Sequence, residues 1–156
     1  MPFFTQPGRI AGSGGPVPDV VELAAGVITC NKGRVVTNTA GAAVLHALGA
    51  TVTNIYGVTL EGAAAGVTDG PGTLLAIAKA NKQTNFVSKC VDTGALTADL
   101  SGVTVGDQYG MLTVGGQDYI DLDDTTNVVA QITKIDDDLN VVWFVFLEST
   151  LQEPNG

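Results

Sequence analysis

The apolar run VVWFVFL at residues 141–147, which ends at Glu148, says more about the fold than any other stretch of the sequence. Seven residues are too few to cross a membrane as a helix, for which about 20 are needed, and β-branched and aromatic side chains favour a strand. An exposed strand of this kind would promote aggregation. The run therefore predicts a strand that is buried on both faces or lies at a subunit contact.

Short apolar or alternating runs separated by turn residues extend this pattern back along the chain. They predict further strands at residues 26–30, 34–38, 53–60, 73–79, 85–90, 102–105, 109–114, 117–122 and 128–135. Gly115-Gly116 predicts a tight two-residue hairpin turn, because both central residues of such a turn need positive φ. Residues 40–50 are a candidate helix, and residues 61–66 a loop or a single turn. Strands this numerous favour an all-β fold, either a compact antiparallel β-barrel or a β-sandwich.

The beginning of the chain has a different composition. Residues 1–19 hold four of the six prolines and four glycines, which disfavour helices and central strands, so they predict an extended N-terminal arm. The β-domain is expected at residues 20–150, followed by a short tail at 151–156. Phe3, Phe4 and Arg9 give the arm side chains that suit a neighbouring subunit, although a disordered N-terminus with incidental aromatics is the alternative.

Composition excludes several functional classes. The 156 residues suffice for one domain, 45% of them are hydrophobic, and the net charge is −9. An acidic chain lacks the basic surface that nucleic acids and anionic membranes require, so neither is expected as a partner. No apolar run approaches the length of a transmembrane helix, and the first residues do not resemble a signal peptide.

The residues that carry enzyme chemistry are scarce. The one histidine, His46, stands among apolar neighbours, and no serine or cysteine partner stands in a nucleophile motif, so it is interpreted as a half-buried or surface residue without a catalytic role. Cys30 and Cys90 lack the spacing of a zinc site. They are interpreted as buried free thiols, with a single disulfide as the alternative. No enzyme activity, cofactor or metal is expected.

Acidic residues gather in the second half of the chain, where residues 79–156 contain 12 acids and four bases. They cluster at Asp118, Asp121, Asp123 and Asp124, and again at residues 136–138. Asp121 and Asp123 resemble the start of a calcium-binding loop, but Thr126 stands where such a loop needs glycine and no glutamate occupies its twelfth position. We therefore expect solvated acidic turns, with a calcium site as the alternative.

Three segments together resemble the small capsid decoration (cement) proteins of tailed bacteriophages. They are residues 108–127 (QYGMLTVGGQDYIDLDDTTN), 135–140 (IDDDLN) and 142–147 (VWFVFL). Residues 55–60 (IYGVTL) and the Ala/Gly segment after them also resemble the central region of these proteins, so the resemblance covers roughly residues 50–148. It implies a non-enzymatic virion protein, made in the host cytoplasm and located on the outer capsid surface. The implied partner is the major capsid protein, and a homotrimer near three-fold positions is expected.

The resemblance suggests roles for particular residues. Phe3, Phe4 and Arg9 are expected to anchor the arm on the capsid, and deletion of residues 1–18 is expected to abolish capsid binding while leaving the fold intact. Trimer contacts are expected from the last strand, at Trp143, Phe144 and Phe146. The alternative is that these three aromatic residues fill the core of the protomer itself.

Two other functions compete with this one. The main rival is a β-domain of a phage fibre or cell-surface protein that binds glycans or a receptor, with Tyr119, Asp121 and Asp123 as its site. An enzyme ranks third, and its best constellation is the carboxylate pair Asp121 and Asp123, as in glycoside hydrolysis.

Overall fold

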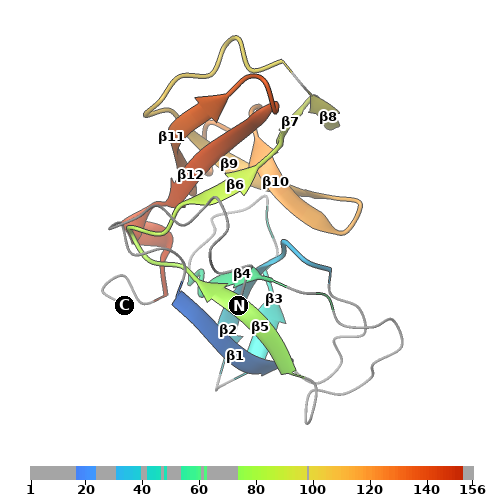
Figure 1. Cartoon of the computed structure of the whole chain (residues 1–156), viewed down its shortest axis with the longest axis vertical. Coiled ribbons are helices and arrows are strands. Elements are labelled where there is room, and N and C mark those ends of the chain that lie inside the picture. The colour runs from blue at the N-terminus through green and yellow to red at the C-terminus, as the bar shows by residue number, and fades with distance from the viewer. Residues whose placement is uncertain are drawn as a thin grey trace.

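The computed structural model describes residues 17–23, 31–39, 42–46, 48, 54–60, 62, 74–97 and 99–152. The predicted all-β class is confirmed, and the strands form two sheets in a sandwich-like arrangement. Figure 1 shows them as two lobes, one above the other. Helix in the described residues is confined to the single 3-10 turn Glu148–Thr150. No described helix is long and apolar enough to span a membrane.

The five-stranded lobe is built from strands whose pairings close on themselves. The strands pair in the cyclic order β1–β3–β2–β4–β5, and β1 returns to β5 in an antiparallel register from Val17↔Lys79 to Glu22↔Leu74. The β1–β3 pairing is parallel and the other pairings are antiparallel. The strands are β1 (Val17–Leu23), β2 (Val35–Thr39), β3 (Ala42–Leu45), β4 (Gly57–Thr59) and β5 (Leu74–Lys79).

The seven-stranded lobe is a single sheet in the order β6–β12–β11–β9–β10–β7–β8. Its pairings are antiparallel except for the parallel pair β7–β10. β12 lies between β6 and β11, which agrees with its apolar sequence, since a strand with two neighbours is covered at both edges. The strands are β6 (Phe86–Ser88), β7 (Cys90–Asp92), β8 (Ala95–Thr97), β9 (Gln108–Val114), β10 (Gln117–Asp121), β11 (Ala130–Asp136) and β12 (Val141–Phe146).

The hairpin predicted at Gly115-Gly116 is confirmed. Both glycines have positive φ, +60° at Gly115 and +79° at Gly116, and they join β9 to β10 with Val114 paired to Gln117. Residues that carry a side chain rarely adopt positive φ. Glycine at both positions therefore fixes the two-residue turn and with it the register of β9 and β10.

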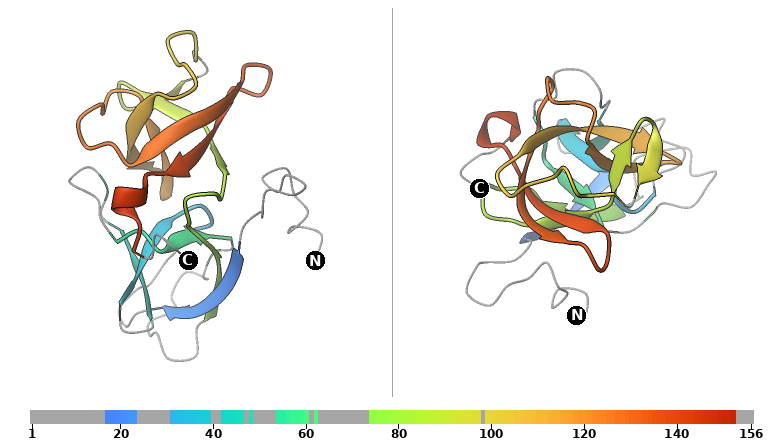
Figure 2. Two further views of the ribbon diagram at one scale, coloured as in Figure 1. Left: turned by 90° about the vertical axis from the view of Figure 1, so that its left-hand side faces the viewer. Right: turned by 90° about the horizontal axis from the view of Figure 1, so that it is seen from above.

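One hydrophobic core joins the two lobes. It contains Phe144 and Phe146 from β12 and Met111 and Ile120 from the β9–β10 hairpin, and it reaches Val35 in the five-stranded lobe. The left view in Figure 2 shows the two lobes stacked one above the other. The described residues of the two lobes therefore share one continuous core.

A buried carboxylate connects the lobes at the same junction. Asp118 of β10 has a fully buried side chain, and Arg34 Nε lies 3.2 Å from its carboxylate. The carboxylate also accepts a hydrogen bond from the Val35 backbone N–H at 2.6 Å and from the Thr113 hydroxyl at 2.6 Å. A buried charge is stable only when paired and hydrogen-bonded, and Asp118 meets both requirements with partners from both lobes.

The end of the described chain makes a second connection between the lobes. After the 3-10 turn, the Gln152 side chain accepts from the Asn38 backbone N–H at 2.9 Å and donates to the Asn38 carbonyl at 2.7 Å. Ile55 N–H donates to the Thr150 carbonyl and Gln152 N–H to the Ile55 carbonyl. Residues 151 and 152, which were expected to belong to a tail, are thus part of the fold.

Several expected elements were wrong. Residues 102–105 form turns and loop instead of a strand, and residues 42–45, inside the candidate helix, form β3. β3 pairs with both β1 and β2, and these pairings override the weak helix preference of an Ala/Gly-rich segment. The expected arm ended at residue 19, but β1 begins at Val17. Residues 1–16, the strand expected at 26–30 and most of the segment at 61–66 lie outside the described residues.

Gly57 of β4 is expected to tolerate no side chain. A Cβ at this position would collide with the Ala78 carbonyl oxygen and the Ile77 side chain of the paired strand β5. Gly57→Ala is therefore expected to lower the free energy of unfolding by about 1–3 kcal/mol, as measured by urea denaturation. The matched control is Gly102→Ala, which meets no atom within 4 Å and should change the free energy by less than about 0.5 kcal/mol. Equal stability of the two variants would show that β4 and β5 are not this close.

Candidate functional site

The predicted arm residues cannot be placed. Phe3, Phe4 and Arg9 lie outside the described residues, so their expected contact with the capsid stays a prediction. Of the residues expected to form the arm, the structure describes only residues 17–19, which begin β1.

Two of the three aromatic residues expected at an oligomer interface lie in the core instead. Phe144 is 2% exposed and Phe146 is 1% exposed. Their ring centroids are 5.3 Å apart in an edge-to-face arrangement, and each ring also packs against Phe86 of β6. The prediction that Phe144 and Phe146 contact another subunit is therefore wrong. The alternative holds for these two residues, because alternate residues of β12 face the core.

Trp143 points the other way and remains available for an interface. It is half-buried on the opposite face of β12, where Lys134 of β11 places its Nζ 5.4 Å from the ring centroid. Val87 of β6, the residue paired with Trp143 on the other side, is 45% exposed. Val141 and Val145 share this face of β12 and are also half-buried. We call Val87, Lys134, Val141, Trp143 and Val145 the outer sheet face.

The outer sheet face has the composition of a protein contact. An aromatic ring and three valines form an apolar strip across neighbouring strands, and one lysine contributes the only charge among these five residues. Trp is enriched at the centres of protein interfaces, where a large rigid ring is covered by a partner. Sequence reasoning found Trp143 but missed Val87 and Lys134, because only the register of β6, β12 and β11 reveals them as its neighbours.

The residues expected to form the alternative glycan site make hydrogen bonds to nearby residues of the protein itself. The Tyr119 hydroxyl donates to Gln117 Oε1 at 2.7 Å on the same face of β10. Asp123 backbone N–H donates to Asp121 Oδ1 at 3.1 Å, and the Asp123 carboxylate accepts from the Thr93 N–H. Partial burial, aided by the charge of Asp123, raises the pKa of Asp121. Asp121 and Asp123 are thus brought together as members of a turn.

Asp124 and Asp136 also accept hydrogen bonds from backbone N–H groups at turns. Asp124 Oδ1 accepts from the N–H groups of Thr126 and Asn127, and these hydrogen bonds help to lower the pKa of Asp124. Asp136 accepts from the Leu139 N–H at the β11–β12 turn. Within the described part of the chain, no three His, Cys, Asp or Glu side chains are grouped so that they could hold a metal ion. Asp124 and Asp136 thus lie at turns as expected, whereas the expectation of a solvated turn was wrong for Asp118, which is buried in β10 because Arg34 and Val35 pair with its carboxylate.

The two cysteines and the histidine were predicted to have no catalytic role. Cys90 is a buried free thiol, and burial raises its pKa to about 11, so it is a poor nucleophile at neutral pH. This confirms the expected free thiol at Cys90, whereas Cys30 lies outside the described residues. His46 is half-buried as predicted, directly after β3, and its backbone N–H donates to the Val35 carbonyl.

No protein-family model, curated protein or solved structure matches this chain.

Proposed function

We propose that this protein is a structural virion protein, a capsid decoration or cement protein that binds the outer surface of a phage head. In this role it stabilises contacts between major capsid subunits. The observation that carries the proposal is the outer sheet face, where Trp143 and the exposed Val87 lie on adjacent strands of a rigid sheet. Apolar side chains gathered in this way mark surfaces that contact other proteins. The resemblance of residues 50–148 to decoration proteins supports the same assignment.

In this proposal the outer sheet face and the N-terminal arm make different contacts. The outer sheet face of the seven-stranded lobe joins three copies into a homotrimer, and the arm that precedes Val17 reaches a capsid subunit through Phe3, Phe4 and Arg9. A trimer presents three arms at once, so weak individual contacts combine through avidity. The continuous core and the buried Asp118–Arg34 pair make each protomer a stiff connector between these contacts.

Deletion of the N-terminal residues tests the role of the arm, and the position of β1 determines where the deletion should end. Val17 and Pro18 pair with Lys79 and Ala78 of β5, so deletion through residue 18 would damage β1. Deletion of residues 1–16 avoids this and is expected to abolish co-sedimentation with capsids while the circular dichroism spectrum and the melting temperature stay unchanged. Undiminished capsid binding by this truncated protein would contradict the role of the arm.

Trp143→Ala is expected to convert the trimer into monomers, because it removes the largest side chain of the outer sheet face. Sedimentation velocity measures the change, and a loss of about 2 kcal/mol or more per interface is expected for an aromatic residue at an interface centre. Val105→Ala serves as the control, since Val105 is 63% exposed in a loop outside this face. A Trp143→Ala variant that stays trimeric, or a native protein that is monomeric, would contradict the assigned interface.

A further inference from the structure

A second surface feature lies on the seven-stranded lobe, away from the outer sheet face. It is a cavity of about 340 Å³ beneath the loop that joins β8 to β9. Asp99, Ser101 and Val103 come from this loop, Asp92 ends β7, Leu122 follows β10, and Tyr109 comes from the start of β9. The volume falls at the lower end of the range of about 300–1,000 Å³ that is typical of ligand pockets.

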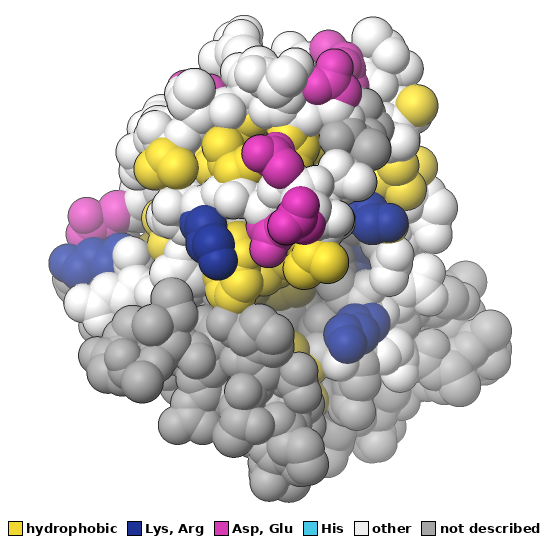
Figure 3. All heavy atoms as spheres, turned by 45° about the horizontal axis from the view of Figure 1, so that its top comes forward, with side chains coloured by type: hydrophobic (Ala, Val, Ile, Leu, Met, Phe, Trp, Pro, Cys, Tyr) yellow, Lys and Arg dark blue, Asp and Glu magenta, His cyan; other side chains and the backbone are white. Residues whose placement is uncertain are grey.

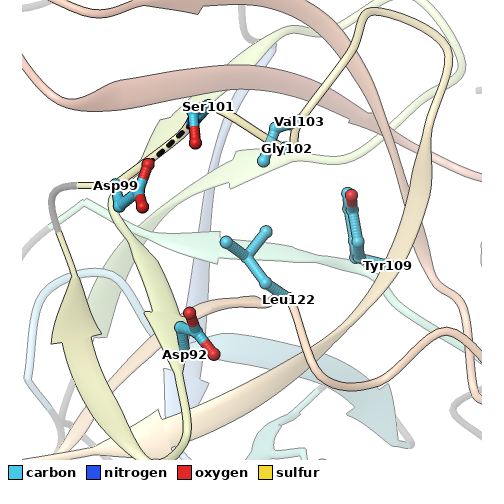
Figure 4. Close-up of a pocket in the computed structure, with 7 residues that line it drawn as sticks. All are labelled: Asp92, Asp99, Ser101, Gly102, Val103, Tyr109 and Leu122. Atoms are coloured by element: carbon cyan, nitrogen blue, oxygen red, sulfur yellow. Dashed lines mark hydrogen bonds between the residues drawn. The ribbon is translucent and has the colours of Figure 1, made fainter.

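The lining of this cavity is divided by polarity. Figure 4 shows the carboxylates of Asp92 and Asp99 on one side, Tyr109 on the other and Leu122 between them. Val103 and Tyr109 are more than nine-tenths buried, so they form fixed apolar walls, whereas Asp99 and Ser101 are exposed at the mouth. The cavity therefore suits a ligand with an apolar stem and a polar end.

The charge of the cavity is negative. The Ser101 backbone N–H donates to Asp99 Oδ1 at 3.0 Å, and this hydrogen bond lowers the pKa of Asp99, which keeps it ionised at neutral pH. The neighbouring charge of Asp92 contributes to the raised pKa of Asp121. The Tyr109 hydroxyl donates to the Asp107 carboxylate at 3.2 Å, and burial raises its pKa, so Tyr109 adds no charge of its own at neutral pH.

The surrounding lobe reinforces this potential. Residues 86–146 contain ten aspartates but only two bases, Lys89 and Lys134, and neither base lines the cavity. Figure 3 shows one acidic group near the top of the visible face and other acidic groups lower down, close to lysine and arginine side chains. Such a field attracts cations and repels phosphates and carboxylates.

We propose that this cavity binds the side chain of a lysine or arginine presented by a partner protein. The aliphatic stem would lie against the half-buried Leu122, and the cationic end would meet Asp92 and Asp99 at the mouth. A sugar fits less well, because it needs an exposed aromatic face for stacking and Tyr109 is only 9% exposed. The proposal does not depend on the capsid assignment, since the cavity and the outer sheet face are formed by different residues.

Titration of the full-length protein with blocked amino acids, followed by two-dimensional 1H–15N NMR, tests this proposal. N-acetyl-arginine amide and N-acetyl-lysine amide are expected to cause saturable shifts at Ser101, Gly102 and Leu122, with dissociation constants on the order of millimolar. N-acetyl-norleucine amide, which keeps the stem but lacks the cation, should bind at least about tenfold more weakly. Raising the salt concentration from about 0.05 M to about 0.5 M should weaken binding of the cationic probes.

Charge-removing variants complete the test. Asp92→Asn and Asp99→Asn are each expected to weaken binding of the arginine probe about threefold, and the double variant about tenfold. The amide oxygen that Asp99→Asn introduces can still accept from the Ser101 N–H, so the loop should keep its conformation. Asp138→Asn, at an exposed turn, is the matched control and should bind as the native protein does. Equal binding of the norleucine probe, unchanged binding by the double variant, or shifts at these residues only with a methyl glycoside would each overturn the proposal.

Discussion

Asp118→Ala is expected to lower the free energy of unfolding by about 3–5 kcal/mol. The change leaves the partly buried guanidinium of Arg34 without its carboxylate, and it removes the acceptor of the Val35 N–H and the Thr113 hydroxyl at the junction of the lobes. Groups that lose their partners inside a protein keep the cost of desolvation without any compensation. Urea denaturation at neutral pH measures the loss.

The control for this variant is Asp138→Ala, an exposed aspartate, which should change stability by less than about 0.5 kcal/mol. The double variant Asp118→Ala with Arg34→Met separates the ion pair from the other contacts, because it removes both charges together. It should recover part of the stability that the single variant loses. A loss below about 1 kcal/mol for Asp118→Ala would show that this carboxylate does not connect the lobes.

Phe146→Ala is expected to cost about 3–5 kcal/mol of unfolding free energy, because it opens a cavity in the middle of the core. The Phe146 ring is 1% exposed and lies 5.3 Å from the rings of both Phe86 and Phe144, so little can move in to fill the space. Thermal unfolding and urea denaturation measure this loss.

The two faces of β12 should respond in opposite ways. Phe146→Ala is expected to lose stability while a folded protein keeps its oligomeric state, whereas Trp143→Ala is expected to lose the oligomer while the protomer stays folded. If the Phe146→Ala protein became monomeric without any loss of protomer stability, Phe146 would belong to the subunit interface. This result would contradict its place in the core.

Local patterns in the sequence predicted the parts of the fold that depend on neighbouring residues. Glycine at 115 and 116 permits the positive φ that a tight two-residue turn needs, and together with the strand-like runs on either side it predicts the β9–β10 hairpin. The apolar run at 141–147 predicted β12, but it did not show that only one face enters the core. Because both faces of this run are apolar, its composition cannot separate Trp143 from Phe144 and Phe146.

Elements held by distant partners were missed for a physical reason. β1 begins at the end of a Pro/Gly-rich stretch and contains Pro18, and it becomes a strand through its pairing with β5, far along the chain. β3 likewise forms from an Ala-rich segment through its pairing with β1 and β2. The outer sheet face and the acidic cavity depend on such pairings too, so Val87 and Asp99 carried no signal in the sequence alone.

Co-sedimentation of the purified full-length protein with capsids assembled from the major capsid protein of the same genome tests the proposed function most directly. The account predicts saturable binding at a fixed ratio of protein to capsid, and greater resistance of the decorated capsids to heat. Binding at three-fold positions would appear as a defined density in electron microscopy of the same samples. Capsids that sediment without the protein at every concentration would contradict the account, and a positive glycan array would then assign the β-domain to glycan recognition.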